Sequence, residues 1–165
     1  MAQLSEKENF LRVVRGEMPE YVPVSTFGGP ESTPLMTMAD PSILGSFRGP
    51  EGGKDPWGVT FVTNAETNYA AIPKPNDFIL TDVRKWRDVI KAPDYSGFDW
   101  EAAAKADREK FVKDPDKTAF VISGYADLFQ QFIGFMGFTE GLCALYEERE
   151  EVEELLDYML EHSLY

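Results

Sequence analysis

Apolar residues recur at helical spacing near the start of the chain and through its second half. In residues 4–16, Ser5 with Glu8 three positions later forms a capping box, and Gly16 is typical of the left-handed residue that ends a helix. The apolar side of this segment consists of Phe10, Leu11 and Val14. The same spacing predicts helices over residues 81–90, 99–114, 126–137, 139–148 and 149–165.

β-branched and aromatic residues mark the expected strands. Residues 21–27, "YVPVSTF", form the first, and residues 118–124, "TAFVISG", form a buried one. Because Pro23 has no amide hydrogen, it limits the first strand to a start, a bulge or an unpaired edge. Residues 57–63 and 68–73 alternate well enough for a β-hairpin around a polar tip.

The order of these elements predicts the fold class. Strands that are separated by helices are typical of α/β folds with parallel strands, and the buried run "AFVIS" supports that arrangement. With 165 residues the chain is long enough for a core of its own. We therefore expect one α/β domain over residues 1–165, with a loop-rich segment over residues 28–58.

The charge of the chain limits its partners. There are 29 acidic residues against 16 basic ones, for a formal net charge of −13, which makes nucleic acid and anionic membranes poor partners. The N-terminus shows no basic region followed by an apolar run, and no segment has the length of a membrane span. With a single cysteine and no internal disulfide, we expect a cytoplasmic protein.

Three segments resemble one protein family. The stretch "SEKENFLRVVRGEMPEYVPV" resembles the opening of the uroporphyrinogen decarboxylase-like superfamily, and "KDPWGVTF" is similar to a segment after its first loops. The stretch "ISGYADLFQQFIGFMGFTEGLCALYEEREEVEELLDYMLEH" looks like the mid-chain strand and helices of that family. The resemblance implies the N-terminal half of a (β/α)8 TIM barrel with an extra N-terminal helix and a β-hairpin insertion. "GEMPEYVPV" would then lead from the outer helix into the first barrel strand.

The resemblance also implies a function. It is greatest to the branch of zinc-dependent methyltransferases that move a methyl group between a small methylated substrate and a corrinoid protein or a thiol. The chain departs from the family in length, and the His and Cys zinc ligands of that branch belong to the half that is absent here. We therefore expect activity only when a C-terminal half completes the chain. Zinc and a corrinoid protein are implied for that complete enzyme, and this chain alone binds no cofactor.

Two alternatives remain open at this point. The chain could be a non-catalytic half-barrel that acts through self-assembly as a homo-oligomer, or through a complementary C-terminal chain, because open sheet edges and apolar helix faces pair readily. The other alternative is uroporphyrinogen decarboxylation in tetrapyrrole biosynthesis. The arginines that hold the substrate carboxylates in that enzyme have no counterpart, because no arginine lies between Arg15 and Arg48.

Candidate substrate-binding residues follow from where chemistry gathers in parallel α/β folds, at the C-terminal ends of strands. Phe27 ends the first predicted strand, and Ser123 and Tyr125 follow the buried one. Ser123 and Tyr125 would orient a polar substrate, and Phe129 with Phe132 would form an apolar wall. The simpler interpretation of the same residues is packing.

Metal and catalytic residues are harder to assign. Cys143 and His162 are a cysteine and a histidine on separate predicted helices, with no second residue of either type. A zinc site would need acidic ligands or another chain, so we assign no metal site and expect a core cysteine and a surface histidine. The hairpin tip, with Asn64, Glu66 and Tyr69 among its residues, is a second candidate contact surface. General acid or base chemistry would fall to Asp or Glu, and the catalytic residues are unassigned.

Overall fold

The computed structural model describes residues 4–23, 36–39, 49–112, 114–117, 119–122 and 127–163. The chain divides into two compact units. Unit 1 consists of Met1–Ile43 with Asp99–Gly124, and unit 2 of Leu44–Phe98 with Tyr125–Tyr165. The single domain expected over residues 1–165 stays a prediction.

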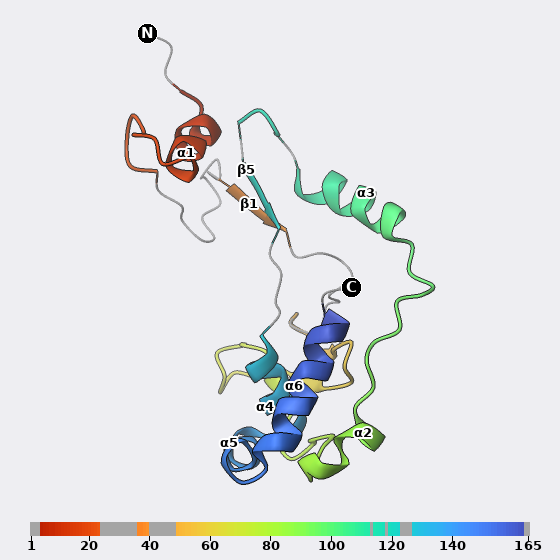
Figure 1. Cartoon of the computed structure of the whole chain (residues 1–165). Helices are drawn as coiled ribbons and strands as arrows, with labels where there is room; N and C mark the ends of the chain where they lie inside the picture. Colours follow the sequence, from red (N-terminus) through yellow and green to blue (C-terminus); the bar gives the residue numbers. More distant parts are fainter. Residues whose placement is uncertain are drawn as a thin grey trace. The chain divides into compact units, whose positions relative to one another are not determined.

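The described residues of unit 1 form two helices and a pair of parallel strands (Figure 1). Its elements are α1 (Glu6–Val14), β1 (Met36–Ala39), α3 (Trp100–Phe111) and β5 (Ala119–Ile122). β1 pairs with β5 so that Met36 lies opposite Ala119 and Ala39 opposite Ile122. β5 was predicted from its apolar run, whereas β1 lies in the segment that was expected to be loop. α3 begins after Asp99, whose side chain caps it by accepting from the Ala102 amide at 2.9 Å.

α1 begins and ends as its sequence predicts. Ser5 caps its first turn by accepting a hydrogen bond from a backbone amide three residues later. At the other end Gly16 has a φ of +75°, and its amide donates to the carbonyl of Val13 at 3.0 Å. The next amide, that of Glu17, donates to the carbonyl of Arg12 at 2.8 Å. These two bonds form a Schellman motif, which satisfies carbonyls at the helix end.

Asn9 decides the path of the chain after α1. Its side chain is fully buried. Its Nδ2 donates to the carbonyl of Tyr21 at 2.9 Å, and its Oδ1 accepts from the amide of Glu20 at 2.8 Å. Tyr21, Val22 and Pro23 are irregular rather than extended in a sheet, so the predicted strand does not begin at Tyr21. The remainder of that strand, residues 24–27, lies outside the described residues.

Unit 2 holds the other elements of the described chain. Its strands are β2 (Gly53–Lys54), β3 (Thr60–Val62) and β4 (Ile72–Pro73). Its helices are η2 (Val83–Lys85), α2 (Trp86–Val89), α4 (Leu128–Met136), α5 (Phe138–Glu147) and α6 (Arg149–Ser163). The strands form an antiparallel sheet in the order β2-β3-β4, with Phe61 opposite Pro73. The antiparallel pairing expected of the hairpin segments is therefore confirmed, with β2 as an added edge.

The prediction of half a (β/α)8 barrel is wrong. A barrel needs successive parallel strands joined by helical crossovers into one sheet. In the described residues the strands instead divide between a parallel pair and a separate, open antiparallel sheet. The three antiparallel strands lie between β1 and β5 in the sequence, yet they pair only with each other. The connections from β2 to β3 and from β3 to β4 contain no crossover helix, and strands joined in that way pair as antiparallel neighbours.

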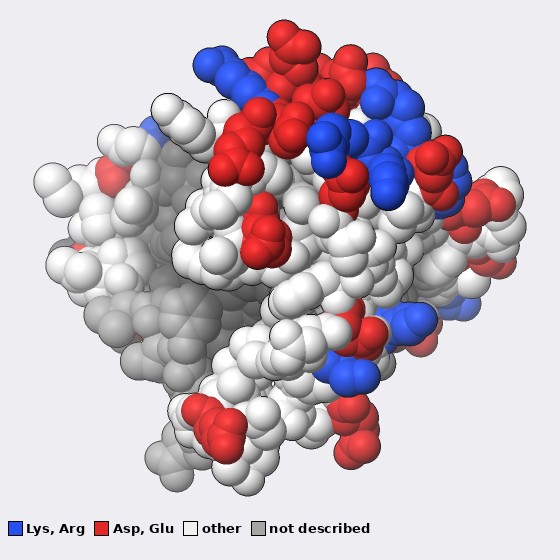
Figure 2. Space-filling model, turned by 90° about the horizontal axis from the view of Figure 1, so that it is seen from below, with Lys and Arg blue, Asp and Glu red and all other residues white. Residues whose placement is uncertain are grey.

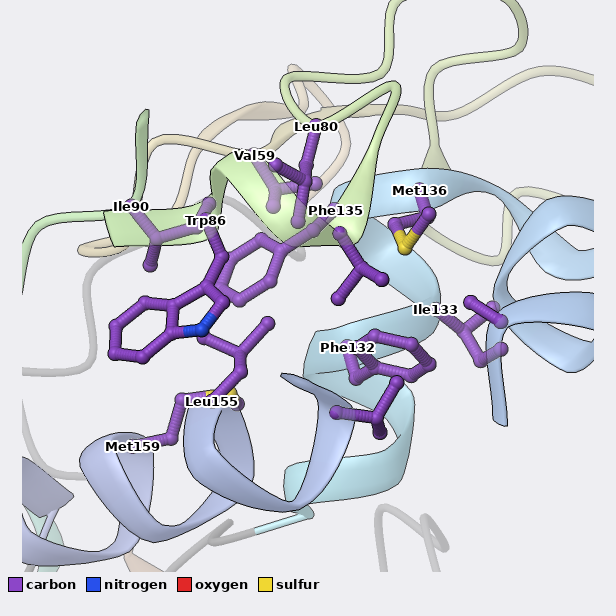
Figure 3. Close-up of a cluster of buried hydrophobic side chains, with 13 residues drawn as sticks. Val59, Leu80, Trp86, Ile90, Phe132, Ile133, Phe135, Met136, Leu155 and Met159 are labelled. Carbon is purple, nitrogen blue, oxygen red and sulfur yellow. The ribbon is translucent and has the colours of Figure 1, made fainter. Parts of the chain in front are cut away.

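The core of unit 2 forms between α4, α6 and the segment around η2 and α2. Figure 3 shows the side chains of Phe132, Phe135 and Leu155 pointing toward one another, and all three are fully buried. The other members of this core are Val59, Leu80, Val83, Trp86, Ile90, Ile133, Met136, Ala144, Val152 and Met159. On α6 the buried Val152, Leu155 and Met159 fall at the helical spacing that the sequence predicts. Among the described residues, no helix combines the length and the apolar character that crossing a bilayer requires.

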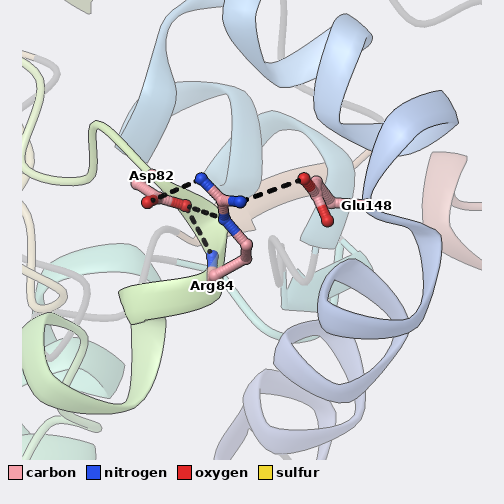
Figure 4. A network of polar contacts seen from close by, with 3 residues as sticks. All are labelled: Asp82, Arg84 and Glu148. Atoms are coloured by element: carbon pink, nitrogen blue, oxygen red, sulfur yellow. Dashed lines mark hydrogen bonds and ion pairs between the residues drawn. The ribbon is translucent and has the colours of Figure 1, made fainter.

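A polar network on the surface of unit 2 fixes the start of η2 (Figure 4). Asp82 caps η2 by accepting from the Arg84 amide at 3.1 Å, and it also accepts from Arg84 Nε at 2.9 Å. Arg84 extends to Glu148, at the end of α5, with 3.7 Å between nitrogen and oxygen. The hydrogen bonds from Arg84 hold the pKa of the Asp82 carboxyl below its ordinary value. Because the side chain of Arg84 is exposed, these ion pairs add little to the stability of unit 2.

The turn between α4 and α5 requires a glycine. Gly137 has a φ of +85° and a ψ of 159°, a conformation that is essentially restricted to glycine. A Cβ at this position would lie 2.7 Å from the ring of Phe78. The sharp change of direction therefore depends on both the backbone and the neighbouring ring.

We predict that Gly137→Ala destabilises unit 2 by about 1–3 kcal/mol from the backbone conformation alone. Displacement of the Phe78 ring adds to that loss. The measurement is urea unfolding followed by circular dichroism. Gly97→Ala is the matched control, because a Cβ there would meet nothing within 4 Å, and its effect should stay within about 0.5 kcal/mol. Equal effects of the two substitutions would contradict the prediction.

We also predict that Asn9→Ala lowers the local unfolding free energy around α1 by about 1–3 kcal/mol, because it removes two hydrogen bonds, each worth about 0.5–1.5 kcal/mol. Hydrogen exchange at the Glu20 amide measures this directly. Lys105→Ala, at an exposed position on α3 of the same unit, is the control. Unchanged protection at Glu20 would show that Asn9 does not hold this segment.

Candidate functional site

A buried carboxyl lies in the segment that follows β2. Asp55 comes directly after Lys54 in the stretch "KDPWG", and only 6% of it is exposed. Its neighbour Trp57 is partly buried against the core of unit 2. Ionised side chains are rarely so buried unless they have partners.

The partners of Asp55 come from its own turn and from α4. Its Oδ1 accepts from the Val59 amide at 2.8 Å, and its Oδ2 accepts from Gln131 Nε2 at 2.7 Å. The backbone closes the same turn, because the Asp55 amide donates to the Val59 carbonyl at 2.9 Å and the Gly58 amide to the Asp55 carbonyl at 3.0 Å. One carboxylate thus holds the turn over residues 55–59 and ties it to α4.

The site perturbs two ionisable groups. Burial raises the pKa of the Asp55 carboxyl above its ordinary value, against the opposing effect of the hydrogen bonds from Gln131 and Val59. Burial also raises the pKa of the Tyr95 phenol, and the negative charge of Asp55 raises it further. Such perturbed groups are frequent at functional sites and also occur in structural networks. Since the Asp55 oxygens already accept from Val59 and Gln131, its clearest role is to position Trp57 and α4.

Aromatic rings extend from this turn to the end of α6. The ring of Trp57 lies 6.2 Å from that of Phe135 and 6.3 Å from that of Tyr158. Tyr158 in turn lies 5.1 Å from Trp86, and its hydroxyl accepts from the Ala92 amide at 2.9 Å. These tilted and edge-on arrangements are favourable for aromatic pairs. Asp55 is therefore two residues from Trp57, a member of this group of aromatic rings.

The substrate-binding residues predicted from the sequence fall mostly outside the described chain. Phe27, Ser123 and Tyr125 are not among the described residues. Phe129 is described near the start of α4, and 42% of it is exposed, so it does not share the buried environment of Phe132. Phe132, predicted as part of the same wall, is fully buried in the core.

The two potential zinc ligands lie on separate helices. Cys143 is exposed on α5, which corrects the expectation of a core cysteine. His162 is exposed near the end of α6, with its ring 4.5 Å from that of Tyr158. Within the described part of the chain, no group of three or more His, Cys, Asp and Glu side chains gathers as a metal site would require.

The hairpin tip is closed by its own residues. The Thr67 amide donates to Asn64 Oδ1 at 2.9 Å, and the Thr67 hydroxyl donates to the Asn64 carbonyl at 3.1 Å. Asn68 and Tyr69 both have a positive φ, and Tyr69 is exposed. The polar residues of the tip are therefore explained by the hydrogen bonds that close the turn.

Asp55, Tyr95 and Gln131 are site residues that sequence reasoning missed. The stretch "DPWG" carried a signal, because an aspartate followed by Pro and Gly is typical of a turn in which the carboxylate accepts backbone hydrogen bonds. No local signal indicated Gln131, which lies 76 residues away.

Comparison with family models, with curated proteins and with solved structures gives no match. The resemblance to the uroporphyrinogen decarboxylase-like superfamily therefore rests on the sequence segments alone.

We predict that Asp55 makes the stability of unit 2 fall as pH rises. Its folded-state pKa is raised above the ordinary value of 3.8, so the folded state binds the proton more tightly, and this contribution is lost as pH rises through the folded-state pKa. The difference in unfolding free energy between the wild-type chain and Asp55→Asn should therefore decrease from pH 4 toward neutrality. Urea unfolding across that range is the measurement.

Gln130→Ala is the control, because Gln130 is exposed on α4 and its removal changes no ionisable group. Its difference from the wild-type chain should stay constant over the same pH range. A wild-type advantage over Asp55→Asn that grows with pH would contradict the raised pKa.

Proposed function

We propose that the chain forms part of an enzyme similar to the uroporphyrinogen decarboxylase-like superfamily, in the branch that moves a methyl group between a small methylated molecule and a corrinoid protein or a thiol. The observation that supports this proposal is the hydrogen bond from Gln131 to Asp55. It joins "KDPWGVTF" to the long segment that begins "ISGYADLFQQ", and both stretches carry the resemblance. Two segments far apart in the sequence that resemble one family thus contact each other within one unit.

In this proposal the chain supplies a wall of the substrate site. Among the described residues, Phe129 is the proposed contact to the methylated molecule. Phe129 lies two residues before Gln131, and its exposure leaves its ring accessible to a ligand. Asp55 acts as a positioning residue, because its carboxylate is occupied by hydrogen bonds within the fold. A cytosolic location is part of the same proposal.

The described residues do not fit the zinc ion that the resemblance implies. Zinc in proteins takes three or four Cys, His or carboxylate ligands at about 2.0–2.3 Å. Cys143 and His162 lie on different helices, and no group of three or more potential ligands gathers in the described chain. We therefore assign no part of the reaction to a metal held by these residues.

A second candidate function is assembly without catalysis, with a further copy or with a partner chain. The observation that favours it is a group of exposed apolar residues at the end of α1 and just after it, Val14, Met18 and Val22. Association would remove these exposed apolar side chains from water. A mass measurement in solution distinguishes an assembled chain from a monomer.

The first experiment measures thermal stabilisation by small methylated molecules. The probes are methanol, trimethylamine and dimethyl sulfide, each compared with its ethyl analogue. A ligand present at 100 times its dissociation constant adds about 2.7 kcal/mol to the unfolding free energy, so binding raises the melting temperature. We expect one methylated probe to raise it and its ethyl analogue to have no effect.

Phe129→Ala tests whether the proposed wall is involved. It should abolish the stabilisation. Phe138→Ala is the matched control, because Phe138 is an exposed phenylalanine on α5. This variant should preserve the stabilisation. Stabilisation by coproporphyrin and by no methylated probe would instead favour tetrapyrrole decarboxylation. No stabilisation by any probe, together with a stable oligomer, would favour assembly.

A further inference from the structure

Among the described residues, Asp55 is the one buried acidic residue. Figure 2 shows many other carboxylates at the surface, several of them next to Lys or Arg side chains. The hydrogen bonds to Asp55 come instead from the Val59 amide and from Gln131, which are both neutral groups. The carboxyl is therefore the member of this hydrogen-bonded group that gains or loses a proton.

The elements around Asp55 bring few other ionisable groups to it. α4 contains none from Leu128 to Met136, and residues 56–59 and β3 contain none either. Lys54 precedes Asp55 on β2 and is exposed. Burial and the charge of Asp55 raise the pKa of the Tyr95 phenol above its ordinary value of 10.0. The phenol therefore stays neutral while a carboxyl titrates.

The two oxygens of Asp55 face donors of different kinds. Oδ1 accepts at 2.8 Å from the Val59 amide, a backbone N–H that has no acceptor to offer in exchange. Oδ2 accepts at 2.7 Å from Gln131 Nε2, and the same side-chain amide carries an acceptor oxygen, Oε1. Oδ2 is therefore the oxygen that can carry a proton and still keep a partner.

Gln131 can exchange its donor for its acceptor without moving α4. The last side-chain torsion of a glutamine is broad and roughly two-fold, so a half-turn of the amide is accessible. The backbone of the helix is fixed independently, because the neighbouring Phe132 and Phe135 are fully buried in the core. Burial raises the pKa of the Asp55 carboxyl, which brings its protonated form closer to neutral pH.

We propose that Asp55 and Gln131 form a proton-responsive latch between the turn over residues 55–59 and α4. In the ionised state, Asp55 Oδ2 accepts from Gln131 Nε2. In the protonated state, a proton from solvent is bound to Oδ2, the amide turns over, and the O–H donates to Gln131 Oε1. One hydrogen bond replaces the other, so the turn stays attached to α4 in both states. The latch does not depend on the methyl-transfer function.

The test follows three signals of the full chain by nuclear magnetic resonance from neutral pH down to pH 4. The Cγ signal of Asp55 reports its protonation, the side-chain amide signals of Gln131 report the half-turn, and hydrogen exchange reports the Val59 amide. We expect the first two to change with one midpoint while Val59 stays protected. His162→Gln, which removes the single histidine of the chain, should leave these changes in place.

Variants test the latch at a constant, neutral pH. Asp55→Asn imitates the protonated carboxyl, because its amide nitrogen donates where the O–H would, so Val59 should stay protected and the Gln131 amide should turn over. Gln131→Met removes both donor and acceptor, and protection of the Val59 amide should fall about three- to tenfold. Gln130→Met is the matched control, since Gln130 is an exposed glutamine on the same helix, and it should leave that protection unchanged.

A reversed pair tests the protonated geometry directly. Gln131→Glu alone brings two carboxylates together and should weaken the link, because like charges repel. Combined with Asp55→Asn, it recreates a carboxylate–amide pair in which residue 55 donates, and protection at Val59 should return. Failure of this rescue would contradict the proposal.

Two further outcomes would overturn it. Side-chain amide signals of Gln131 that stay constant while Asp55 titrates would show that the amide does not turn over. Loss of protection at Val59 on protonation of Asp55, or in Asp55→Asn, would show that the turn is released from α4 instead of being held.

Discussion

The burial of α4 is the constraint on which unit 2 depends. Phe132 and Phe135 are completely buried, and Ile133 and Met136 of the same helix belong to the same core. The hydrogen bond from Gln131 to Asp55 adds a polar link between α4 and the turn after β2. Because that carboxylate is buried, it is tolerated only while its partners remain, so the turn and the helix stabilise each other's position.

The same constraint shapes the functional interpretation. Asp55 has a raised pKa and a buried position, both of which are common among catalytic carboxylates. Its hydrogen bonds to Val59 and Gln131 nevertheless use the oxygens that a substrate would need. The methyl-transfer proposal therefore places substrate contacts on residues such as Phe129, which is exposed on the same helix. Asp55 serves to orient that helix.

Charged side chains and exposed apolar side chains both lie on the outside of unit 2. The carboxylates of α5 and α6 are mostly exposed, and so are the rings of Phe138 and Tyr146 on α5. Arg84 and Arg149 compensate part of this charge through Glu148 and Glu153. Arg87 compensates Glu154 in the same way, so the described ion pairs of these helices lie at the end of α5 and along α6.

Local features of the protein were determined by the sequence itself. Ser5, Asp99 and Gly16 mark helix ends correctly, because capping hydrogen bonds and left-handed turns involve residues only a few positions apart. The buried face of α6 follows from the spacing of Val152, Leu155 and Met159 for the same short-range reason. The antiparallel pairing of β3 with β4 was also predictable, since the two strands are close in sequence.

Contacts between distant residues were decided only by the tertiary structure. Asn9 holds the chain after α1 and keeps Tyr21 out of a strand that its own propensity favours. β5 pairs with β1, which lies in a segment expected to be loop, and Asp55 accepts a hydrogen bond from Gln131 across 76 residues. Neither pairing leaves a periodic signal in the sequence, because both depend on which buried surfaces meet when the chain packs. The barrel expectation failed, and the site around Asp55 was missed, for that physical reason.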